Sequence, residues 1–226
     1  MIRLQEQGFE IIPGVVSQET VGTVCESLAK APLSRGRAGM RNALRVPVVQ
    51  ALATDKNLVN FARDILGKGA IAFRATLFDK SQSSNWLVVW HQDTALPLRE
   101  RRDVPGWGPW SVKEDVICAH APASALEQVL AIRVHLDDSN EENGPLRVLP
   151  RSHTAGGVLT DEAIHDLAIK TPAMDCHVAA GGILLMRPLI VHASSKARSE
   201  NARRRVLHIE YAASRNLPGG LELDIC

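Results

Sequence analysis

The stretch 70-AIAFRATLF-78 decides the fold, because from here on the hydrophobic residues recur with the period of a β-strand. Short strand-like runs then follow one another, separated by turn residues such as Asn143-Gly144-Pro145 and Gly181-Gly182. These further runs are residues 86–90, 129–136, 146–149, 183–186, 189–191 and 204–211. Many short strands behind a helical first third predict a mainly β fold with outer helices, of the antiparallel sandwich or small-barrel kind.

The residues before this stretch predict an outer helical layer. Ser17 caps a predicted helix that Pro32 stops, and Thr54 caps a second helix that ends at Gly67. Residues 33–45, rich in glycine and arginine, are expected to form an exposed loop. The expected division is a single domain over residues 1–226, with the helical layer over about 1–69 and the β core over 70–213.

The composition argues against several classes of function. Lysine and arginine number 26 against 25 aspartates and glutamates, so the net charge of +1 lacks the basic excess that nucleic-acid binding demands. No apolar run is long enough to span a bilayer. Four cysteines without paired spacing predict free thiols in a reducing compartment. The sequence therefore predicts a cytoplasmic protein that binds neither nucleic acid nor a membrane.

One tripeptide carries the first sign of metal chemistry. His91-Gln92-Asp93 lies at the end of a predicted strand, where alternation puts His91 and Asp93 on the same face. His192 follows 101 residues later, at the end of another apolar run. Two histidines and one carboxylate on one face of a metal leave the opposite positions open, as in non-haem Fe(II) oxygenases. Taken alone, the tripeptide is more typical of a turn with a hydrogen-bonded aspartate.

The segment after His192 strengthens the metal interpretation. Ser194 and then Arg203-Arg204-Arg205 follow, and the arginines lead into a predicted strand. The open metal positions suit a chelating 2-oxo acid, and the planar fork of an arginine suits the carboxylate at its far end. Strand alternation allows at most two of the three arginines to share a face. The alternative is that this cluster, with Arg198, only solvates a turn.

Further motifs then line up along the chain in a fixed order. They are His91-Gln92-Asp93, Glu142-Asn143-Gly144-Pro145-Leu146, Pro150-Arg151-Ser152-His153, and His192-Ala193-Ser194 with Arg203. Together they resemble the phytanoyl-CoA dioxygenase family of Fe(II)/2-oxoglutarate oxygenases. The resemblance extends over about residues 4–213. Two turns depart from the family pattern, since Arg151 stands where the family usually has glycine and Gly182 where it usually has aspartate.

The resemblance implies a double-stranded β-helix, the jelly roll of cupin-like proteins, with Fe(II) near one open end. It implies that His91, Asp93 and His192 are the catalytic iron ligands. Halogenases that are similar to this family carry a small residue in place of the carboxylate. The presence of Asp93 therefore favours hydroxylation.

The resemblance also implies a binding site for the co-substrate. Arg203, with help from Ser194, is expected to hold the 5-carboxylate of 2-oxoglutarate. Lys80 matches a position where the family often places a second cation near this co-substrate. A lysine in an exposed loop beside Asp79 is the alternative interpretation of Lys80.

Three residues are candidates for contacts with the substrate. Trp107 and Trp110 lie in a long loop over residues 95–113, which is either a lid that excludes water or a surface loop anchored by its indoles. On the strand predicted over 129–136, Arg133 shares one face with His135. Arg133 binds an anionic substrate group if that face points inward, and it is an ordinary surface charge if the face points outward.

The sequence thus predicts an Fe(II)- and 2-oxoglutarate-dependent dioxygenase that uses O₂ to hydroxylate a small organic substrate and releases succinate and CO₂. Two alternatives stay open at this point. One is a zinc-dependent hydrolase-type metalloenzyme built on the same ligands. The other is a non-catalytic jelly-roll binding module. The oligomeric state does not follow from the sequence.

Overall fold

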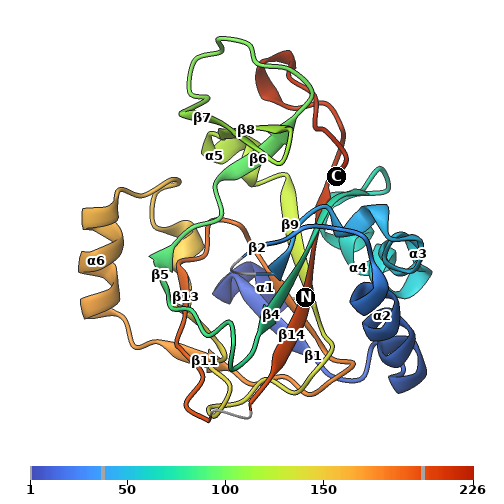
Figure 1. The fold of residues 1–226 in the computed structure, drawn as a ribbon. Helices are drawn as coiled ribbons and strands as arrows, with labels where there is room; N and C mark the ends of the chain where they lie inside the picture. The colour runs from blue at the N-terminus through green and yellow to red at the C-terminus, as the bar shows by residue number, and fades with distance from the viewer. Residues whose placement is uncertain (1, 37–38, 200–201) are drawn as a thin grey trace.

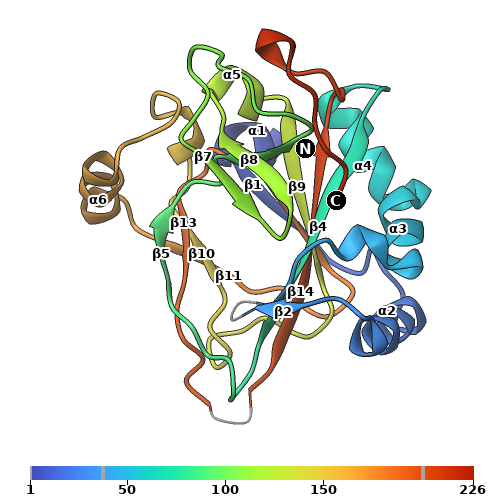
Figure 2. The same cartoon turned by 45° about the horizontal axis from the view of Figure 1, so that its top comes forward.

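A computed structural model describes residues 2–36, 39–199 and 202–226, and two antiparallel sheets that lie opposite each other form its centre (Figures 1 and 2). The larger sheet has the strand order β1 (Phe9–Ile12), β12 (Ile183–Met186), β9 (Val129–His135), β14 (Arg204–Ala212), β4 (Ile71–Lys80), β3 (Gly39–Met40) and β2 (Arg35–Gly36). The smaller sheet has the order β11 (Met174–Cys176), β10 (Leu146–Val148), β13 (His192–Ser194) and β5 (Val88–His91). This arrangement confirms the predicted mainly β jelly roll with outer helices.

Helices cover the outer face of the larger sheet, to the right in Figure 1. They are α2 (Gln18–Lys30), α3 (Pro47–Thr54) and α4 (Lys56–Leu66). Ser17 caps α2 as predicted, and its Oγ accepts a hydrogen bond from the Thr20 amide at 3.1 Å. The remaining helices are α1 (Ile2–Gln7), α5 (Ala123–Leu126) and α6 (Asp161–Lys170), with 3₁₀ turns η1 (Ala43–Arg45), η2 (Ser152–Thr154) and η3 (Pro218–Gly220).

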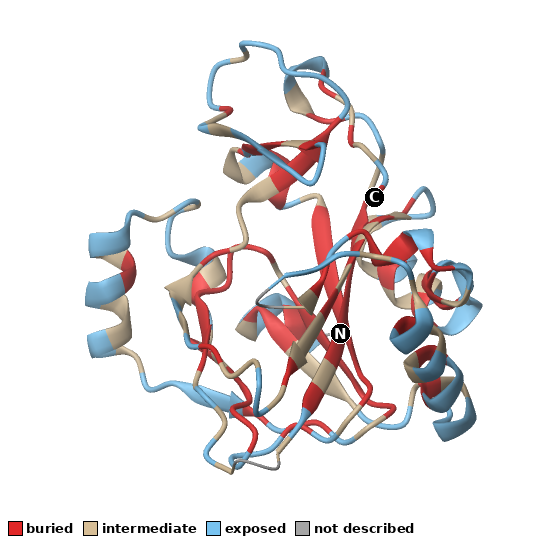
Figure 3. Cartoon of the chain, viewed as in Figure 1, coloured by how far each residue is buried: buried red, intermediate tan, exposed pale blue. Residues whose placement is uncertain are grey.

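Alternation along β14 gives the larger sheet an apolar outer face and a polar inner face. Leu207 and Ile209 are fully buried in the core cluster that the outer helices share. Arg204, His208 and Glu210 occupy the intervening positions and line a cavity between the two sheets. Figure 3 shows these central strands as buried and the outward sides of the helices as exposed. The polar residues of the inner face are therefore enclosed by the fold, and their charges require specific partners.

A third sheet closes one end of the molecule, at the top of Figure 1. Its order is β6 (Ala95–Leu98), β8 (Val116–His120) and β7 (Trp110–Lys113). The predicted loop over residues 95–113 is therefore a strand at each end, and only its middle lacks regular structure. Pro97, Lys113 and Val116 from this sheet line the same cavity, so the third sheet covers the space between the other two.

Several element boundaries in the first 69 residues differ from the prediction. Residues 33–45 are not simply a loop, because β2 and β3 extend the larger sheet and Met40 is fully buried. Thr54 does not cap the helix that follows it. It ends α3, and the Asp55 carboxylate caps α4 by accepting the Asn57 amide at 2.8 Å. The N-terminal part thus contributes strands as well as a helical layer.

The cysteines and the helices bear on two further predictions. Cys25, Cys118, Cys176 and Cys226 are free thiols, as their spacing predicted. Within the described part of the chain, no helix is both long enough and apolar enough to cross a membrane.

Candidate metal centre

Strand pairing in the smaller sheet brings the two histidines together. β5 and β13 run antiparallel, and His91 and His192 are direct partners in their register. Their ring centroids lie 4.2 Å apart. Asp93 follows two residues after His91, and its amide donates to the Pro188 carbonyl at 3.0 Å, which holds the end of β5 against the turn before β13. Local alternation and this long-range pairing together place all three side chains at one point.

The geometry of the three side chains fits a metal ion. His91 Nε2 lies 3.7 Å from Asp93 Oδ1, and His192 Nε2 lies 3.6 Å from Asp93 Oδ2. All three ligand atoms lie within 4.8 Å of one another. Nitrogen and oxygen ligands bind divalent metals at about 2.0–2.2 Å, so a single ion between them reaches all three. The sequence prediction that these residues converge is consistent with this placement.

Hydrogen bonds fix which ring nitrogen of each histidine faces the metal position. His91 Nδ1 lies 2.9 Å from the Val89 carbonyl, and His192 Nδ1 lies 3.0 Å from the Ile190 carbonyl. A carbonyl oxygen only accepts, so each Nδ1 carries the proton and each Nε2 presents a lone pair. Backbone carbonyls that orient metal-binding imidazoles in this way are a common feature of metal sites.

The protonation states also suit metal binding. Burial lowers the pKa of His192 to about 4, so this imidazole is neutral at physiological pH. Burial raises the pKa of Asp93, but electrostatic attraction to the His192 imidazole and the hydrogen bond with His91 outweigh it and hold that pKa well below its usual value. Burial lowers the pKa of His91, but the hydrogen bond with Asp93 outweighs burial and raises it. The site therefore presents a neutral His192 and an ionised Asp93, and a divalent cation would displace the proton that Asp93 favours on His91.

Gln92, in the middle of the tripeptide, is a structural residue that the sequence interpretation did not single out. Its side chain is buried, and its amide donates to the carbonyls of Leu189 and Gly157 at 2.7 and 3.0 Å. Its Oε1 accepts the Leu159 amide at 2.8 Å. Gln92 thereby ties the metal-bearing strand to the two segments that flank it.

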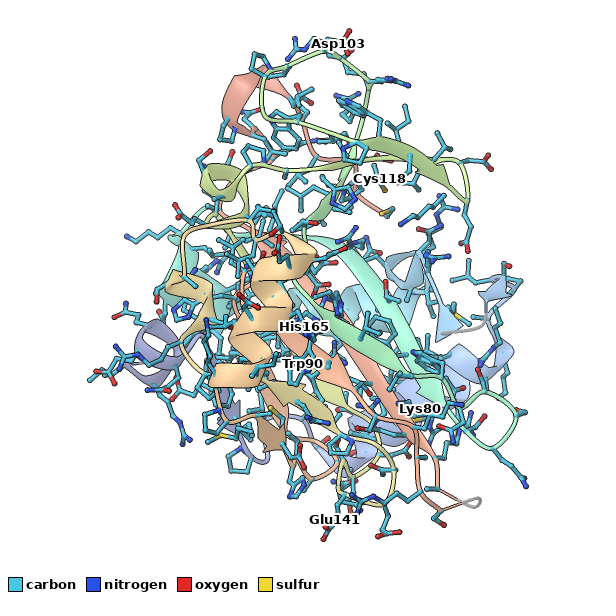
Figure 4. All side chains as sticks on the ribbon, turned by 90° about the vertical axis from the view of Figure 1, so that its left-hand side faces the viewer. Lys80, Trp90, Asp103, Cys118, Glu141 and His165 are labelled. Atoms are coloured by element: carbon cyan, nitrogen blue, oxygen red, sulfur yellow. The ribbon has the colours of Figure 1, made fainter. Side chains whose placement is uncertain are left out.

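The ligands face a cavity of about 460 Å³ between the sheets. The smaller sheet and the turn after β5 supply the histidines and Asp93, and the larger sheet supplies most of the opposite wall. The cavity-facing residues of that opposite wall are Arg74, Thr76 and Phe78 from β4, Arg133 from β9, and Arg204, His208 and Glu210 from β14. Figure 4 looks toward the smaller sheet, with Trp90 beside α6 and Lys80 at the far end of β4.

The three consecutive arginines have three different environments, and the expected one is not in the cavity. Arg203 is half exposed and makes a bidentate ion pair with Asp79, with N–O distances of 3.0 and 2.9 Å. Arg205 pairs in the same way with Asp137. Arg204 alone lines the cavity and is 3% exposed. Arg203 is the residue that the resemblance assigns to the 5-carboxylate of 2-oxoglutarate, but the structure does not place it in the cavity wall. It lies just before β14 and points outward, as Arg205 does, and Arg204 has the inward position.

Arg204 is poorly compensated by the chain itself. Its Nη2 donates to Ser194 Oγ at 3.1 Å, while its Nε and Nη1 have no hydrogen-bond partner among the described residues. Buried guanidinium nitrogens without partners are rare in a finished fold. An arginine binds a carboxylate through Nη2 together with either Nε or Nη1, as Arg203 and Arg205 do through Nε and Nη2. Arg204 therefore keeps an unused donor on each of these two edges for an anion.

Lys80 and Ser194 lie beside Arg204, as the resemblance led us to expect for a second cation. Lys80 is 1% exposed, is the register partner of Arg204, and donates through Nζ to Ser194 Oγ at 2.9 Å and to the Ser195 carbonyl. Burial and the charge of Arg204 lower the pKa of Lys80 to about 7. Ser194 Oγ in turn donates to the Gly144 carbonyl at 3.1 Å. Lys80 is thus an interior residue, and not a lysine in an exposed loop.

The tryptophans of the predicted lid do not reach the cavity. Trp107 is 9% exposed and packs in a cluster with Leu96 and Leu217, and Trp110 packs against the edge of the same cluster. Neither indole is among the described residues that line the cavity, and their packing matches the alternative in which the indoles anchor a surface segment. Trp86 lines the cavity instead. Its ring centroid lies 5.3 Å from Lys80 Nζ.

Fold and site together define a class of protein. A jelly roll that presents two histidines and an aspartate to a cavity, opposite a buried arginine with unused donors, is the architecture of the Fe(II)- and 2-oxoglutarate-dependent oxygenases.

Comparison with known proteins gives the family. The chain belongs to the phytanoyl-CoA dioxygenase (PhyH) family, whose model matches residues 4–206. As a member, it is an Fe(II)/2-oxoglutarate-dependent dioxygenase that uses Fe(II), 2-oxoglutarate and O₂. No curated protein matches the chain.

Several solved structures share the fold. EctD from S. alaskensis, with 2-oxoglutarate and 5-hydroxyectoine, has a TM-score of 0.71 at 18% identity over 96% of this chain and 76% of its own. HygX from Streptomyces hygroscopicus, with nickel, 2-oxoglutarate and hygromycin B bound, has a TM-score of 0.67 at 19% identity over 99% of this chain and 94% of its own. AviO1 from Streptomyces viridochromogenes Tue57 has a TM-score of 0.68 at 19% identity over 96% of both chains.

Proposed function

We propose that this protein hydroxylates an unactivated carbon of a small organic molecule, with His91, Asp93 and His192 as the iron ligands and Arg204, Ser194 and Lys80 as the anchor for 2-oxoglutarate. One observation carries the proposal. Three ligand atoms within 4.8 Å of one another share a cavity with a buried arginine that has two unpaired nitrogens. The related structures of HygX and EctD contain 2-oxoglutarate, which supports 2-oxoglutarate as the co-substrate.

The chemistry is balanced by the two co-substrates. One oxygen atom of O₂ goes into the C–H bond of the substrate and the other into succinate, and the first carboxyl group of 2-oxoglutarate leaves as CO₂. When bound, the iron supplies the activation of O₂ and the oxidising power that this reaction needs. The protein supplies three fixed ligands on one side of the ion, which leaves the cavity side free for co-substrate and O₂.

The residues of the larger sheet set the position of 2-oxoglutarate. Arg204 offers two N–H donors to the carboxylate remote from the iron, and Ser194, which bonds to both cations, holds Arg204 in place. Enclosure between the sheets strengthens these charged contacts, since little water competes for them. Lys80 acts through Ser194 as a positioning residue.

Two features favour hydroxylation over other reactions at such a site. Asp93 occupies the position that halogenases similar to this family leave to a small residue. A zinc-dependent hydrolase on the same ligands needs a free general base. Apart from Asp93, the carboxylate that lines the cavity within the described residues is Glu210, and Arg74 holds it in a bidentate ion pair.

The proposal is tested by loading the protein anaerobically with Fe(II) and 2-oxoglutarate. We expect a visible metal-to-ligand charge-transfer band, followed by succinate formation when O₂ is admitted. His192→Ala is expected to abolish the band while the fold, measured by circular dichroism, is kept. His165→Ala removes an exposed histidine of α6 and serves as the control (Figure 4).

Two results would contradict the proposal. A protein that binds Fe(II) but shows neither band nor succinate across a broad substrate panel is not an oxygenase of this type. Zinc-dependent hydrolysis of an ester or amide in the same panel would support the alternative.

A further inference from the structure

A second buried arginine faces the cavity from the larger sheet. Arg133, on β9, is 5% exposed and lines the cavity together with the metal ligands. Within the described residues its contacts are a hydrogen bond from Nη1 to His208 Nδ1 at 3.0 Å and a cation–π contact with Phe78, 5.2 Å from the ring centroid. Its Nε is buried without a partner. Of the two orientations that the sequence left open, the structure shows the inward one, in which the guanidinium can contact a molecule bound in the cavity.

The charge of Arg133 is not balanced by a carboxylate of the cavity wall. Glu210 is paired with Arg74, and Asp93 faces the metal position. No carboxylate in residues 2–36, 39–199 and 202–226 lies within ion-pair distance of Arg133. An unpaired charge in a protein interior is costly. The structure keeps it all the same, which is expected where a bound anion completes the pair.

His208 orients Arg133 without neutralising it. A guanidinium only donates, so His208 Nδ1 must accept and its proton must lie on Nε2. That Nε2 lies 3.7 Å from Glu210 Oε2, at the end of the ion pair with Arg74. Burial and the charge of Arg133 lower the pKa of His208 to about 3, so the imidazole stays neutral. The row Arg133–His208–Glu210–Arg74 therefore fixes the guanidinium and leaves its positive charge free.

The charges of the cavity leave room for more than one anion. The two carboxylates of 2-oxoglutarate are assigned to the iron and to Arg204. Arg133 remains, and Lys113 and Arg41 add further positive charge to the same walls. Arg41 already has a partner in Glu114, at 3.2 Å. Arg133 is thus a buried cation without a carboxylate partner among the described residues. The 5-carboxylate of 2-oxoglutarate does not supply one, because it is assigned to Arg204.

We propose that Arg133 binds a carboxylate of the primary substrate, so that the protein oxidises small organic acids, with Arg133 as the residue that determines this specificity. The inference rests on the function proposed above and narrows its substrate class. A carboxylate in the cavity has two possible sources, the substrate and the metal-binding end of 2-oxoglutarate. The experiment separates the two.

The binding arm uses the intact protein, loaded anaerobically with Fe(II) and 2-oxoglutarate, and measures thermal stabilisation and calorimetric affinity. The probes are straight-chain and aromatic monocarboxylates of six to ten carbons, each compared with its primary amide. The wild-type protein is expected to bind carboxylates more tightly than their amides. Arg133→Gln is expected to weaken carboxylate binding roughly 10- to 100-fold, since a hydrogen bond between charged groups contributes about 1.5–3 kcal/mol. Affinity for the amides should not change.

Three further measurements distinguish a direct contact between Arg133 and the carboxylate from a general effect of the substitution on the fold or the charge of the cavity. Arg41→Gln makes the same chemical change on the same cavity wall, at an arginine that already has a carboxylate partner, and should leave carboxylate binding within about twofold, as for exposed ion pairs. Arg133→Lys keeps the charge but loses the fork, and should restore part of the affinity. Arg133→Gln removes an uncompensated buried cation, so its melting temperature should be equal to or above that of the wild type.

The turnover arm distinguishes this inference from the function on which it rests. Arg133→Gln should keep its affinity for 2-oxoglutarate, measured from the charge-transfer band, and its slow substrate-free succinate formation, while carboxylates no longer stimulate succinate release. Three results would overturn the inference: equal binding of carboxylates and amides by the wild type, unchanged carboxylate binding in Arg133→Gln, or a loss of 2-oxoglutarate affinity in that variant. The last result would assign Arg133 to the co-substrate. Failure of the wild type to form any succinate would overturn the proposed function itself.

Discussion

At the scale of single residues, three consecutive arginines have different partners because their side chains point in different directions. Arg203 and Arg205 both make bidentate ion pairs with aspartates outside the cavity. Arg204 lies between them and faces inward with unused donors. The same residue type therefore makes ion pairs with aspartates at two positions and faces the cavity with unused donors at the third, where we propose that it binds 2-oxoglutarate.

This contrast gives a direct prediction for the co-substrate. Arg204→Gln should raise the Kd for 2-oxoglutarate by roughly 30-fold or more, because removing one partner of a buried charge pair costs about 2–5 kcal/mol. Arg203→Gln should change the Kd by less than about twofold, the range of exposed pairs. Titration of the anaerobic Fe(II) protein with 2-oxoglutarate measures both. The assignment fails if Arg203→Gln proves the more damaging change.

Lys80 gives a prediction about pH. Its pKa is about 7 in the folded protein against 10.5 for an ordinary lysine, so between these values the unfolded chain holds a proton that the folded protein lacks. The free energy of unfolding of the ligand-free protein should therefore rise with pH across this window, with a slope of at most about 1.4 kcal/mol per pH unit. Below pH 7 both states are protonated and the contribution of Lys80 no longer changes.

The measurement is urea denaturation of the wild type and Lys80→Met from pH 7 to 9.5. The difference between the two proteins isolates this lysine, and the exposed Lys56→Met is the control. Identical pH slopes in wild type and Lys80→Met would show that Lys80 titrates normally.

At the scale of elements, the turn before β10 decides how closely two segments approach. Gly144 has φ +66°, and a Cβ placed there would lie 2.3 Å from the Ser195 carbonyl oxygen. That carbonyl accepts from Lys80, and the Gly144 carbonyl accepts from Ser194. The glycine thus sets the position of the anion anchor as well as the turn.

Gly144→Ala is expected to destabilise the protein through both the backbone conformation and the steric clash. Gly14 offers a matched control, because its φ is +65° and nothing lies within 4 Å of a built Cβ. Gly14→Ala should cost about 1–2 kcal/mol for the left-handed conformation alone. Gly144→Ala should cost clearly more in denaturant unfolding and should also weaken 2-oxoglutarate binding. Equal costs at the two positions would mean that the turn yields without moving Ser195.

Some features of the helices and strands could be predicted from the sequence, and others could not. Alternation is a short-range property, so the shared face of His91 and Asp93 follows from the sequence alone. The Ser17 cap follows in the same way from local hydrogen bonding. That His91 and His192 become register partners depends on pairing across 101 residues, and here the ordered motifs of the family resemblance supplied the information.

The predictions that differ from the structure concern residues whose surroundings depend on segments far away in the sequence. The family resemblance points to Arg203, while strand alternation leaves open which of the three arginines faces inward. That choice depends on which face of β14 packs against the helices, and this is set by its pairing in the larger sheet. Trp107 looked like part of a lid because its packing partner Leu217 is remote in sequence. Strands β7 and β8 are not among the predicted strands, and β8 pairs with both β7 and β6.

At the scale of the whole molecule, a near-neutral chain encloses a positively charged interior. The net charge is +1, yet the cavity walls carry Arg41, Arg74, Lys113, Arg133 and Arg204 against Asp93 and Glu210. The balancing negative charge lies elsewhere on the molecule. We expect this internal asymmetry to attract anions to the cavity although the chain as a whole carries almost no net charge.

The residues of the cavity come from two different sheets, so the two sheets can change separately in evolution. The metal ligands come from β5, β13 and the turn after β5, whereas Arg133 and its row of partners come from β9, β14 and β4. If Arg133 binds the substrate as proposed, substitutions in the second group should alter which molecule is recognised and leave the metal ligands in place. Divergence toward new substrates, in nature or in a directed-evolution library confined to Arg133, Arg74, Thr76 and Phe78, would then start from an enzyme that still holds its metal and co-substrate.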